Sequence, residues 1–155
     1  QKSLKVTNNI PDECQVFMSP MHFETILGNL IGNAIKYSFI EGNVTIDATE
    51  ERDSIVLSIK DEGIGIEPEH IPRVFEEFYR ADNSRHERGS HGLGLAIARR
   101  VADMYRGIIT VESAGAGKGS VFHLHLKKNP EPFLKKREGL IQTITQQQGE
   151  ENGRE

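Results

Sequence analysis

The chain has 155 residues and a formal net charge of −4 at pH 7, a length that suits one domain with a buried core. The slightly acidic balance gives no electrostatic case for nucleic acid or an anionic membrane as a partner. The lone Cys14 excludes an internal disulfide and a cysteine-built zinc site, and it fits a reducing compartment. No apolar run approaches about 18 residues, and no signal-peptide pattern opens the chain. Because residue 1 is Gln rather than Met, a fragment of a longer protein is one interpretation.

The first part of the chain predicts two short strands and a long helix. The strands are expected at residues 4–6 and 15–18. Ser19 is a favourable N-cap and Pro20 a favourable first residue for a helix that runs to about residue 38. The apolar residues of this helix recur on one face: Phe23, Ile26, Leu27, Leu30, Ile31, Ala34 and Ile35.

Two β-hairpins and a second helix account for most of the remaining chain. In the first hairpin, two strands with alternating apolar residues are joined by a polar turn at residues 50–53 and bury one face: Val44, Ile46, Ala48, Ile55, Leu57 and Ile59. Residues 61–91 are rich in glycine, proline and charge, and so long a loop in a compact domain is usually functional. A helix with apolar spacing from Leu93 then ends at Gly107, and the second hairpin spans residues 108–126.

This order of elements predicts an α+β fold. It is a two-layer sandwich with a mixed, mostly antiparallel sheet and helices on one face. The domain is expected to cover residues 1–128. Residues 129–155 form a predicted tail, with a short helix possible at 133–144 and a frayed, glutamine-rich end.

One edge of the first helix carries polar side chains beside its apolar face. At about 100° per residue, Asn29, Asn33 and Lys36 fall along the same edge. Carboxamide oxygens suit a hard cation such as Mg²⁺, and a lysine suits phosphate. The alternative is a polar rim that is simply solvated, and the helix alone does not decide between the two.

Two glycine-rich motifs flank the long loop. Residues 61–66, Asp-Glu-Gly-Ile-Gly-Ile, follow a strand, where a carboxylate can accept a hydrogen bond from an exocyclic amine and the glycines let the backbone approach a flat ligand. Residues 92–95, Gly-Leu-Gly-Leu, open the second helix, whose free N–H groups and dipole favour an anion. A simple turn and a glycine-rich helix start are the alternatives, and neither motif fits the dinucleotide pattern.

Two other phosphate-binding signatures are excluded. Residues 117–120, Gly-Lys-Gly-Ser, lack the helix that a P-loop requires and are interpreted as a hairpin turn. The chain also has neither the His-Arg-Asp loop nor the Asp-Phe-Gly motif of protein kinases.

The order of the motifs resembles one family. An Asn-bearing helix, Asp-x-Gly-x-Gly after a strand, the pair Phe75 and Phe78, a long loop, and Gly-Leu-Gly-Leu before a helix occur in that order. This order resembles the catalytic, ATP-binding domain of sensor histidine kinases, within the gyrase, heat-shock-chaperone, histidine-kinase and mismatch-repair ATPase superfamily. The resemblance covers about residues 4–127. It implies a Bergerat-type fold with ATP and Mg²⁺ as ligands.

The resemblance implies a role for each residue on the helix edge. Asn33 would coordinate Mg²⁺, and Asn29 would support the same site one turn earlier. Lys36 and Tyr37 would reach the phosphates and the nucleotide. Asn33 and Lys36 are therefore the candidate catalytic residues.

The same resemblance assigns the rest of the pocket. Asp61 would bind the adenine amine, and Phe75 and Phe78 would anchor a lid at about residues 80–91, although a place in the core explains both rings equally well. The other implied nucleotide contacts come from the pocket floor, the lid and the start of the second helix: Gly63, Gly65, Ile66, Arg85, Gly92, Leu93, Gly94 and Leu95.

The histidines depart from the family pattern in two ways. His91 lies where the family commonly has Thr or Ser, and we hypothesise that its imidazole contacts the β- or γ-phosphate near neutral pH, with a solvent-facing position as the alternative. None of the six histidines has the sequence context of the family's phosphate acceptor. The acceptor is therefore expected on a separate domain.

Asn29 bears on the type of reaction. Related ATP hydrolases carry a glutamate at this position that activates water. An amide cannot act as a base, so transfer to a histidine is favoured over hydrolysis. A serine kinase of the anti-sigma-factor type and a catalytically silent nucleotide-binding module remain alternatives. The resemblance also implies the dimerisation domain of the same kinase as partner, a downstream response regulator, and a cytoplasmic place in a bacterial membrane-bound sensor.

Overall fold

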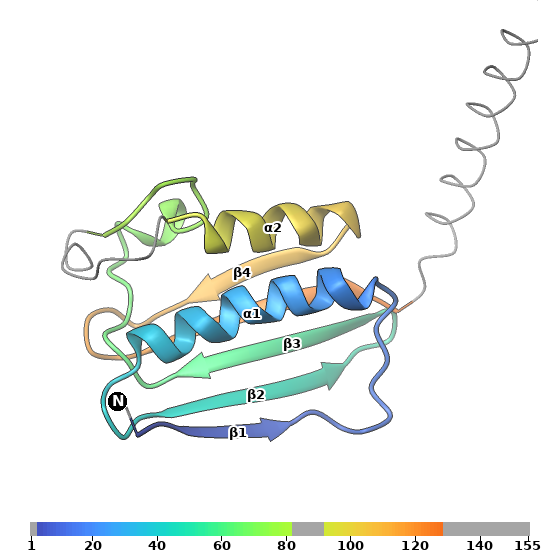
Figure 1. Cartoon of the computed structure of the whole chain (residues 1–155), viewed down its shortest axis with the longest axis horizontal. Helices are drawn as coiled ribbons and strands as arrows, with labels where there is room; N and C mark the ends of the chain where they lie inside the picture. The colour runs from blue at the N-terminus through green and yellow to red at the C-terminus, as the bar shows by residue number, and fades with distance from the viewer. Residues whose placement is uncertain (1–2, 82–91, 129–155) are drawn as a thin grey trace, which may run out of the picture.

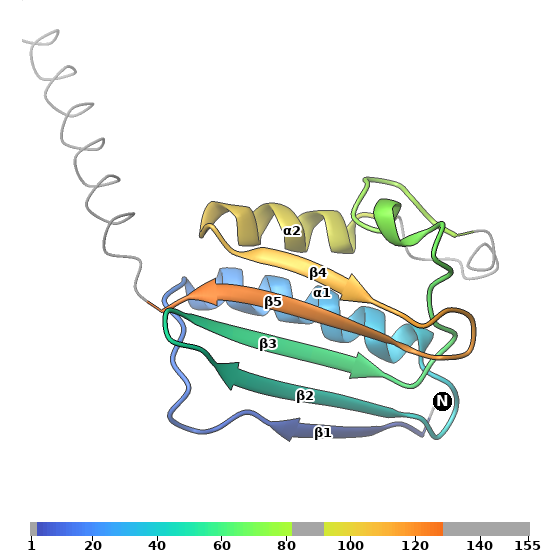
Figure 2. The same cartoon turned by 180° about the vertical axis from the view of Figure 1, so that it is seen from behind.

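The computed structural model describes residues 3–81 and 92–128. The described residues form a five-stranded sheet in the order β1-β2-β3-β5-β4. Both α-helices cover one face of this sheet (Figure 1), and the view from behind shows the other face without a covering helix in the described part of the chain (Figure 2). The elements, in chain order, are β1 (Lys5–Asn9), α1 (Pro20–Tyr37), β2 (Asn43–Glu50), β3 (Ser54–Asp61), the 3₁₀ helix η1 (Ile71–Arg73), α2 (Gly94–Met104), β4 (Ile108–Glu112) and β5 (Ser120–Lys127).

The strand directions confirm the predicted fold class. β1 pairs in parallel with β2, whereas the pairs β2–β3, β3–β5 and β4–β5 are antiparallel. A parallel pair needs a crossover connection, and α1 supplies it between β1 and β2. The result is an α+β two-layer sandwich with a mixed, mostly antiparallel sheet.

The core lies between the two helices and the covered face of the sheet. Ile26, Leu30 and Ala34 recur every four residues along α1 and are buried. Alternate residues of the sheet meet them, and Leu57 and Phe122 are among the fully buried ones. Both predicted hairpins are therefore confirmed with the expected face inward. Within the described ranges, neither α-helix is long and apolar enough to cross a membrane.

Two local predictions differ from the structure. Residues 15–18 do not form a strand; Val16 and Met18 pack against the core, so their alternation reflects burial without a strand partner. The short helix η1 was not expected in the long loop. The predicted helix at 133–144 lies outside the described residues, and the domain boundary at residue 128 stays a prediction.

Candidate active site

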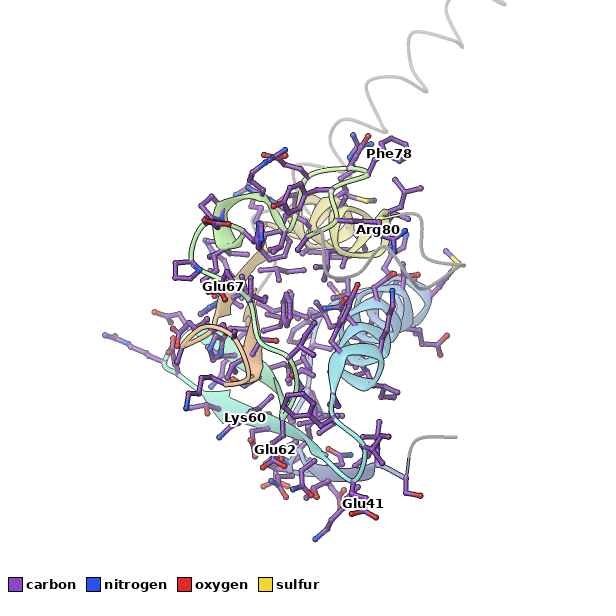
Figure 3. The ribbon with its side chains drawn as sticks, turned by 90° about the vertical axis from the view of Figure 1, so that its left-hand side faces the viewer. Glu41, Lys60, Glu62, Glu67, Phe78 and Arg80 are labelled. Atoms are coloured by element: carbon purple, nitrogen blue, oxygen red, sulfur yellow. The ribbon has the colours of Figure 1, made fainter. Side chains whose placement is uncertain are left out.

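A cavity of about 500 Å³ opens at the end of the molecule where β3 ends and α2 begins, a volume typical of small-molecule sites. Figure 3 looks onto this end, with Glu67 and Arg80 near the cavity and Phe78 at the periphery. Eleven residues predicted from the sequence line it: Asn29, Asn33, Lys36, Tyr37, Asp61, Gly65, Ile66, Gly92, Leu93, Gly94 and Leu95. The polar edge of α1, the segment after β3 and the start of α2 thus meet around one cavity.

The polar edge of α1 forms one wall of the cavity. Asn29 Nδ2 donates to the Thr25 carbonyl at 2.7 Å, and its Oδ1 lies 2.7 Å from the position that a Cβ on Gly94 would occupy. A larger residue at position 94 would therefore displace the Asn29 carboxamide from this wall. Lys36 Nζ donates to the Tyr37 hydroxyl at 3.2 Å. Among the described residues, the Asn33 carboxamide has no hydrogen-bond partner, so its oxygen is available to a ligand.

Asp61 is the most buried polar side chain that lines the cavity. It is the last residue of β3 and only 3% exposed. The Ser120 hydroxyl donates to Asp61 Oδ2 at 2.5 Å, because β5 pairs Ser120 directly opposite Asp61. Burial raises the pKa of the Asp61 carboxyl above its ordinary value, and hydrogen bonding from Ser120 offsets part of that rise. The Asp61 carboxylate is therefore a buried hydrogen-bond acceptor at the wall of a mainly apolar cavity.

The glycines after Asp61 allow the chain to pass between α1 and the β4–β5 turn. A Cβ on Gly63 would lie 2.1 Å from the Tyr37 carbonyl oxygen. Gly65 has φ +71°, and a Cβ there would lie 2.1 Å from the Gly115 carbonyl oxygen. No other residue fits either position without moving the backbone.

We expect Gly63→Ala to lower the free energy of unfolding by about 2–3 kcal/mol, because the added methyl overlaps backbone that cannot move alone. Gly28→Ala is the matched control: it lies inside α1, and a Cβ there meets no atom within 4 Å. That change should raise stability by about 0.5–1 kcal/mol through helix propensity. Urea unfolding of both variants measures the difference. Equal midpoints would contradict the close approach of residue 63 to the end of α1.

The start of α2 forms the opposite wall. Leu93 is the N-cap residue and offers no side-chain acceptor to the first turn, so the N–H groups there are open to an anion. Gly92 has φ +67°, and its carbonyl accepts a hydrogen bond from the Phe78 N–H at 3.0 Å. The segment after β3 is thereby held against the helix start.

The structure does not bring every predicted residue into the cavity. Phe78 is 69% exposed and absent from the lining; its backbone, at φ +63°, turns the ring outward. Phe75 is a core residue, with its ring edge-on to Phe122 at 6.3 Å. Gly63 is not among the lining residues. Arg85 and His91, and most of the predicted lid, lie outside the described residues.

Several lining residues could not be identified from the sequence. Ser120 had no signal of its own, because only the pairing of β3 with β5 places it on Asp61. His70 Nδ1 and the Tyr79 hydroxyl are hydrogen-bonded at 2.6 Å, and the Arg73 guanidinium lies over the Tyr79 ring at 4.2 Å. The other missed residues come from α1, α2, β5 and the connecting loops: Gly28, Gly32, Ile64, Glu67, Val74, Ile97, Ala116 and Phe122. Arg80 and Ala81, which also line the cavity, begin the predicted lid.

An apolar cavity with a few converging polar groups is typical of small-ligand sites, and this one lies at the open end of the α+β sandwich. Residues 18–130 match the family described as Histidine kinase-, DNA gyrase B-, and HSP90-like ATPase. The chain belongs to this ATPase family, which confirms the resemblance found in the sequence.

Similar proteins are sensor histidine kinases. The sensor histidine kinase RppB of Synechocystis sp. is 43% identical over 102 residues, which are 65% of this chain and 22% of RppB. The sensor histidine kinase WalK of Bacillus subtilis is 38% identical over 136 residues, which are 84% of this chain and 22% of WalK. The chain thus spans about a fifth of the length of these relatives.

Solved structures agree on the fold. The mycobacterial sensor histidine kinase MprB superimposes with a TM-score of 0.73 at 26% identity, over 80% of this chain and 83% of that one. Full-length ShkA, solved in complex with AMPPNP, gives a TM-score of 0.69 at 25% identity, over 80% of this chain and 25% of that one.

Proposed function

We propose that this chain is the Mg²⁺–ATP-binding catalytic domain of a sensor histidine kinase, which transfers the γ-phosphoryl group of ATP to a histidine on a separate dimerisation domain. The observation that carries the proposal is the meeting of three groups around one cavity: the buried carboxylate of Asp61, the carboxamide of Asn33 and the N-terminus of α2. They suit adenine, metal and phosphates respectively. Membership of the ATPase family and the similarity to sensor histidine kinases support it.

The chain's residues fit Mg²⁺ only as a partner of the nucleotide. The described ranges contain no group of three or more His, Cys, Asp or Glu side chains that could hold a metal ion. Mg²⁺ usually keeps several waters and binds through one or two protein oxygens together with substrate phosphates. The Asn33 oxygen fits that role. When bound, the ion would neutralise charge on the phosphates.

The residues of the cavity would bind and orient ATP rather than activate water. Asn29 is an amide engaged with the Thr25 carbonyl, and it cannot act as a general base. Lys36 would lie beside the phosphates, and the N–H groups that begin α2 would hold them. This arrangement leaves the γ-phosphoryl group for a nucleophile that another domain supplies.

The proposed setting is a bacterial two-component system. The dimerisation domain of the parent kinase would be the direct partner, and a response regulator would receive the phosphoryl group next. The parent would be a membrane-bound sensor, with this domain on the cytoplasmic side.

Transfer can be measured by mixing the chain with γ-labelled ATP, Mg²⁺ and the dimerisation domain of its parent. We expect acid-labile label on a histidine of that domain, and none when the chain carries Asp61→Ala. Release of phosphate alone would instead indicate a hydrolase. Acid-stable label would indicate a serine kinase, and ATP binding without turnover a silent module.

A further inference from the structure

The face of the sheet that the helices leave open carries a pair of histidines. His123 and His125 lie two residues apart on β5, so their side chains project from the same face, opposite to the buried Phe122 and Leu124. β5 lies between β3 and the edge strand β4 (Figure 2). Both histidines are half-buried. Neither lines the nucleotide cavity, so the proposed function does not use them.

The distance between the His123 and His125 rings is compatible with binding of one metal ion by both. Their centroids are 6.2 Å apart, and their planes are inclined at 50°. A metal bound at about 2.0–2.1 Å from an imidazole nitrogen lies about 3.2 Å from the ring centre. Two rings on one metal therefore have centroids about 4.5 to 6.4 Å apart, for angles at the metal from about 90° to 180°. The observed separation of 6.2 Å lies at the upper end of that range.

Hydroxyl groups of the neighbouring strands orient both imidazoles. His123 Nδ1 and the Ser58 hydroxyl of β3 are hydrogen-bonded at 2.8 Å, and His125 Nε2 lies 3.4 Å from the Thr110 hydroxyl of β4. Within the described part of the chain, His123 Nε2 and His125 Nδ1 have no partner. A histidine that ligates a metal commonly donates its other N–H to such an acceptor, which fixes the tautomer and the ring.

The neighbouring strands place apolar and charged residues on this face; Glu112 and Lys60 both lie opposite Val121, two residues before His123. Val56, which is 9% exposed, pairs with His125 across the sheet. Asp47, on the same face in β2, already accepts a hydrogen bond from Asn9 Nδ2 at 2.8 Å. As no group of three or more candidate ligands occurs in the described residues, water would complete the coordination.

We propose that His123 and His125 form a bidentate site for a divalent transition-metal ion that prefers imidazole, with affinity in the order Cu²⁺ above Ni²⁺ and Zn²⁺. The site is separate from the nucleotide cavity and does not depend on the proposed kinase function. Because the metal must displace protons from imidazole, binding weakens in acid.

Titration calorimetry of the whole, untagged chain with the chloride salts of Cu²⁺, Ni²⁺ and Zn²⁺ tests the site at pH 7.5 and pH 5.5. We expect one ion per chain at pH 7.5 and weaker binding at pH 5.5. His123→Gln and His125→Gln should each lower the affinity at least tenfold, and Ser58→Ala should lower it about tenfold or more through loss of the orienting hydroxyl. His70→Gln, which removes a histidine on the other side of the sheet, should leave it unchanged.

Paramagnetic broadening by substoichiometric Cu²⁺ locates the ion independently. We expect the NMR signals of Val56, Ser58 and Thr110 to broaden first, while those of Asn33 and Gly94 persist. Circular dichroism checks that each variant stays folded. Unchanged affinity in both histidine variants, or broadening centred elsewhere, would overturn the proposal. No saturation below about 1 mM Cu²⁺, a free energy weaker than about −4 kcal/mol, would also overturn it.

Discussion

Replacing Asp61 by asparagine is expected to abolish nucleotide binding while making the empty domain more stable. The carboxylate is the only buried charged group among the described lining residues, and it would accept a hydrogen bond from the adenine amine. In the asparagine variant, the Ser120 hydroxyl still donates to the side-chain oxygen, which leaves the amide N–H₂ facing another donor. A mismatch of this kind at a buried position should weaken ATP binding at least about 100-fold. Asp61→Ala should have the same effect, and unchanged ATP affinity by calorimetry would disprove the role.

The gain in stability follows from the direction of the pKa shift at Asp61. Burial raises the pKa of the folded carboxyl above its ordinary value of 3.8, so folding favours the protonated form. The stability that this group contributes is fully present below pH 3.8 and is lost as pH rises through the folded pKa. At pH 7 the buried carboxylate therefore destabilises the fold. A neutral asparagine should raise the melting temperature by about 2–4 °C at pH 7, and the difference should narrow towards pH 4.

Glu62→Gln is the matched control for the loss of a carboxylate. Glu62 follows Asp61 but is exposed and outside the cavity lining. Hydrogen bonds from the Asn43 side chain and backbone lower the pKa of Glu62, so its stabilising effect is present above its ordinary pKa and is lost as pH falls through the lowered one. Its replacement should slightly lower the melting temperature at pH 7 and leave ATP affinity unchanged. An equal rise in melting temperature in both variants would contradict burial as the cause.

The parts of the fold that follow from local pattern were predictable from the sequence. α1 begins at Pro20 as predicted, although the Ser19 side chain makes no capping hydrogen bond, and its buried stripe follows from helical spacing. Both hairpins follow from alternation. The parallel pairing of β1 with β2 and the insertion of β5 between β3 and β4 join residues far apart in the chain. No periodicity within one segment encodes such pairings.

The difference between local pattern and long-range pairing also explains which site residues could be predicted from the sequence. Asn33, Asp61 and Gly94 belong to local motifs, and the structure brings them to one cavity. Ser120 meets Asp61 across a separation of 59 residues, so only the assembled sheet reveals it. The role of Phe78 was implied by the family resemblance, which does not reveal that this ring is 69% exposed and outside the cavity in this chain.

Asn33→Ala should separate metal-dependent chemistry from nucleotide binding. Affinity for ADP in the presence of EDTA should change less than about threefold, because the adenine contact at Asp61 is untouched. The gain in ATP affinity on adding Mg²⁺ should disappear, and the rate of transfer to the dimerisation domain should fall at least about 100-fold. Calorimetry with and without Mg²⁺ and the labelled-transfer assay measure the two effects.

Further variants show whether Asn33→Ala lowers phosphoryl transfer by unfolding the domain or by removing a metal ligand. The Asn33 side chain has no hydrogen-bond partner in the described part of the chain, and alanine is the better helix former, so Asn33→Ala should not lower the melting temperature. Glu24→Ala, a change on the exposed face of α1 outside the cavity, should leave transfer intact. Asn33→Asp keeps an oxygen in place and should recover part of the Mg²⁺ dependence that alanine removes. Full transfer by Asn33→Ala, or no difference between the aspartate and alanine variants, would show that the residue does not hold the metal.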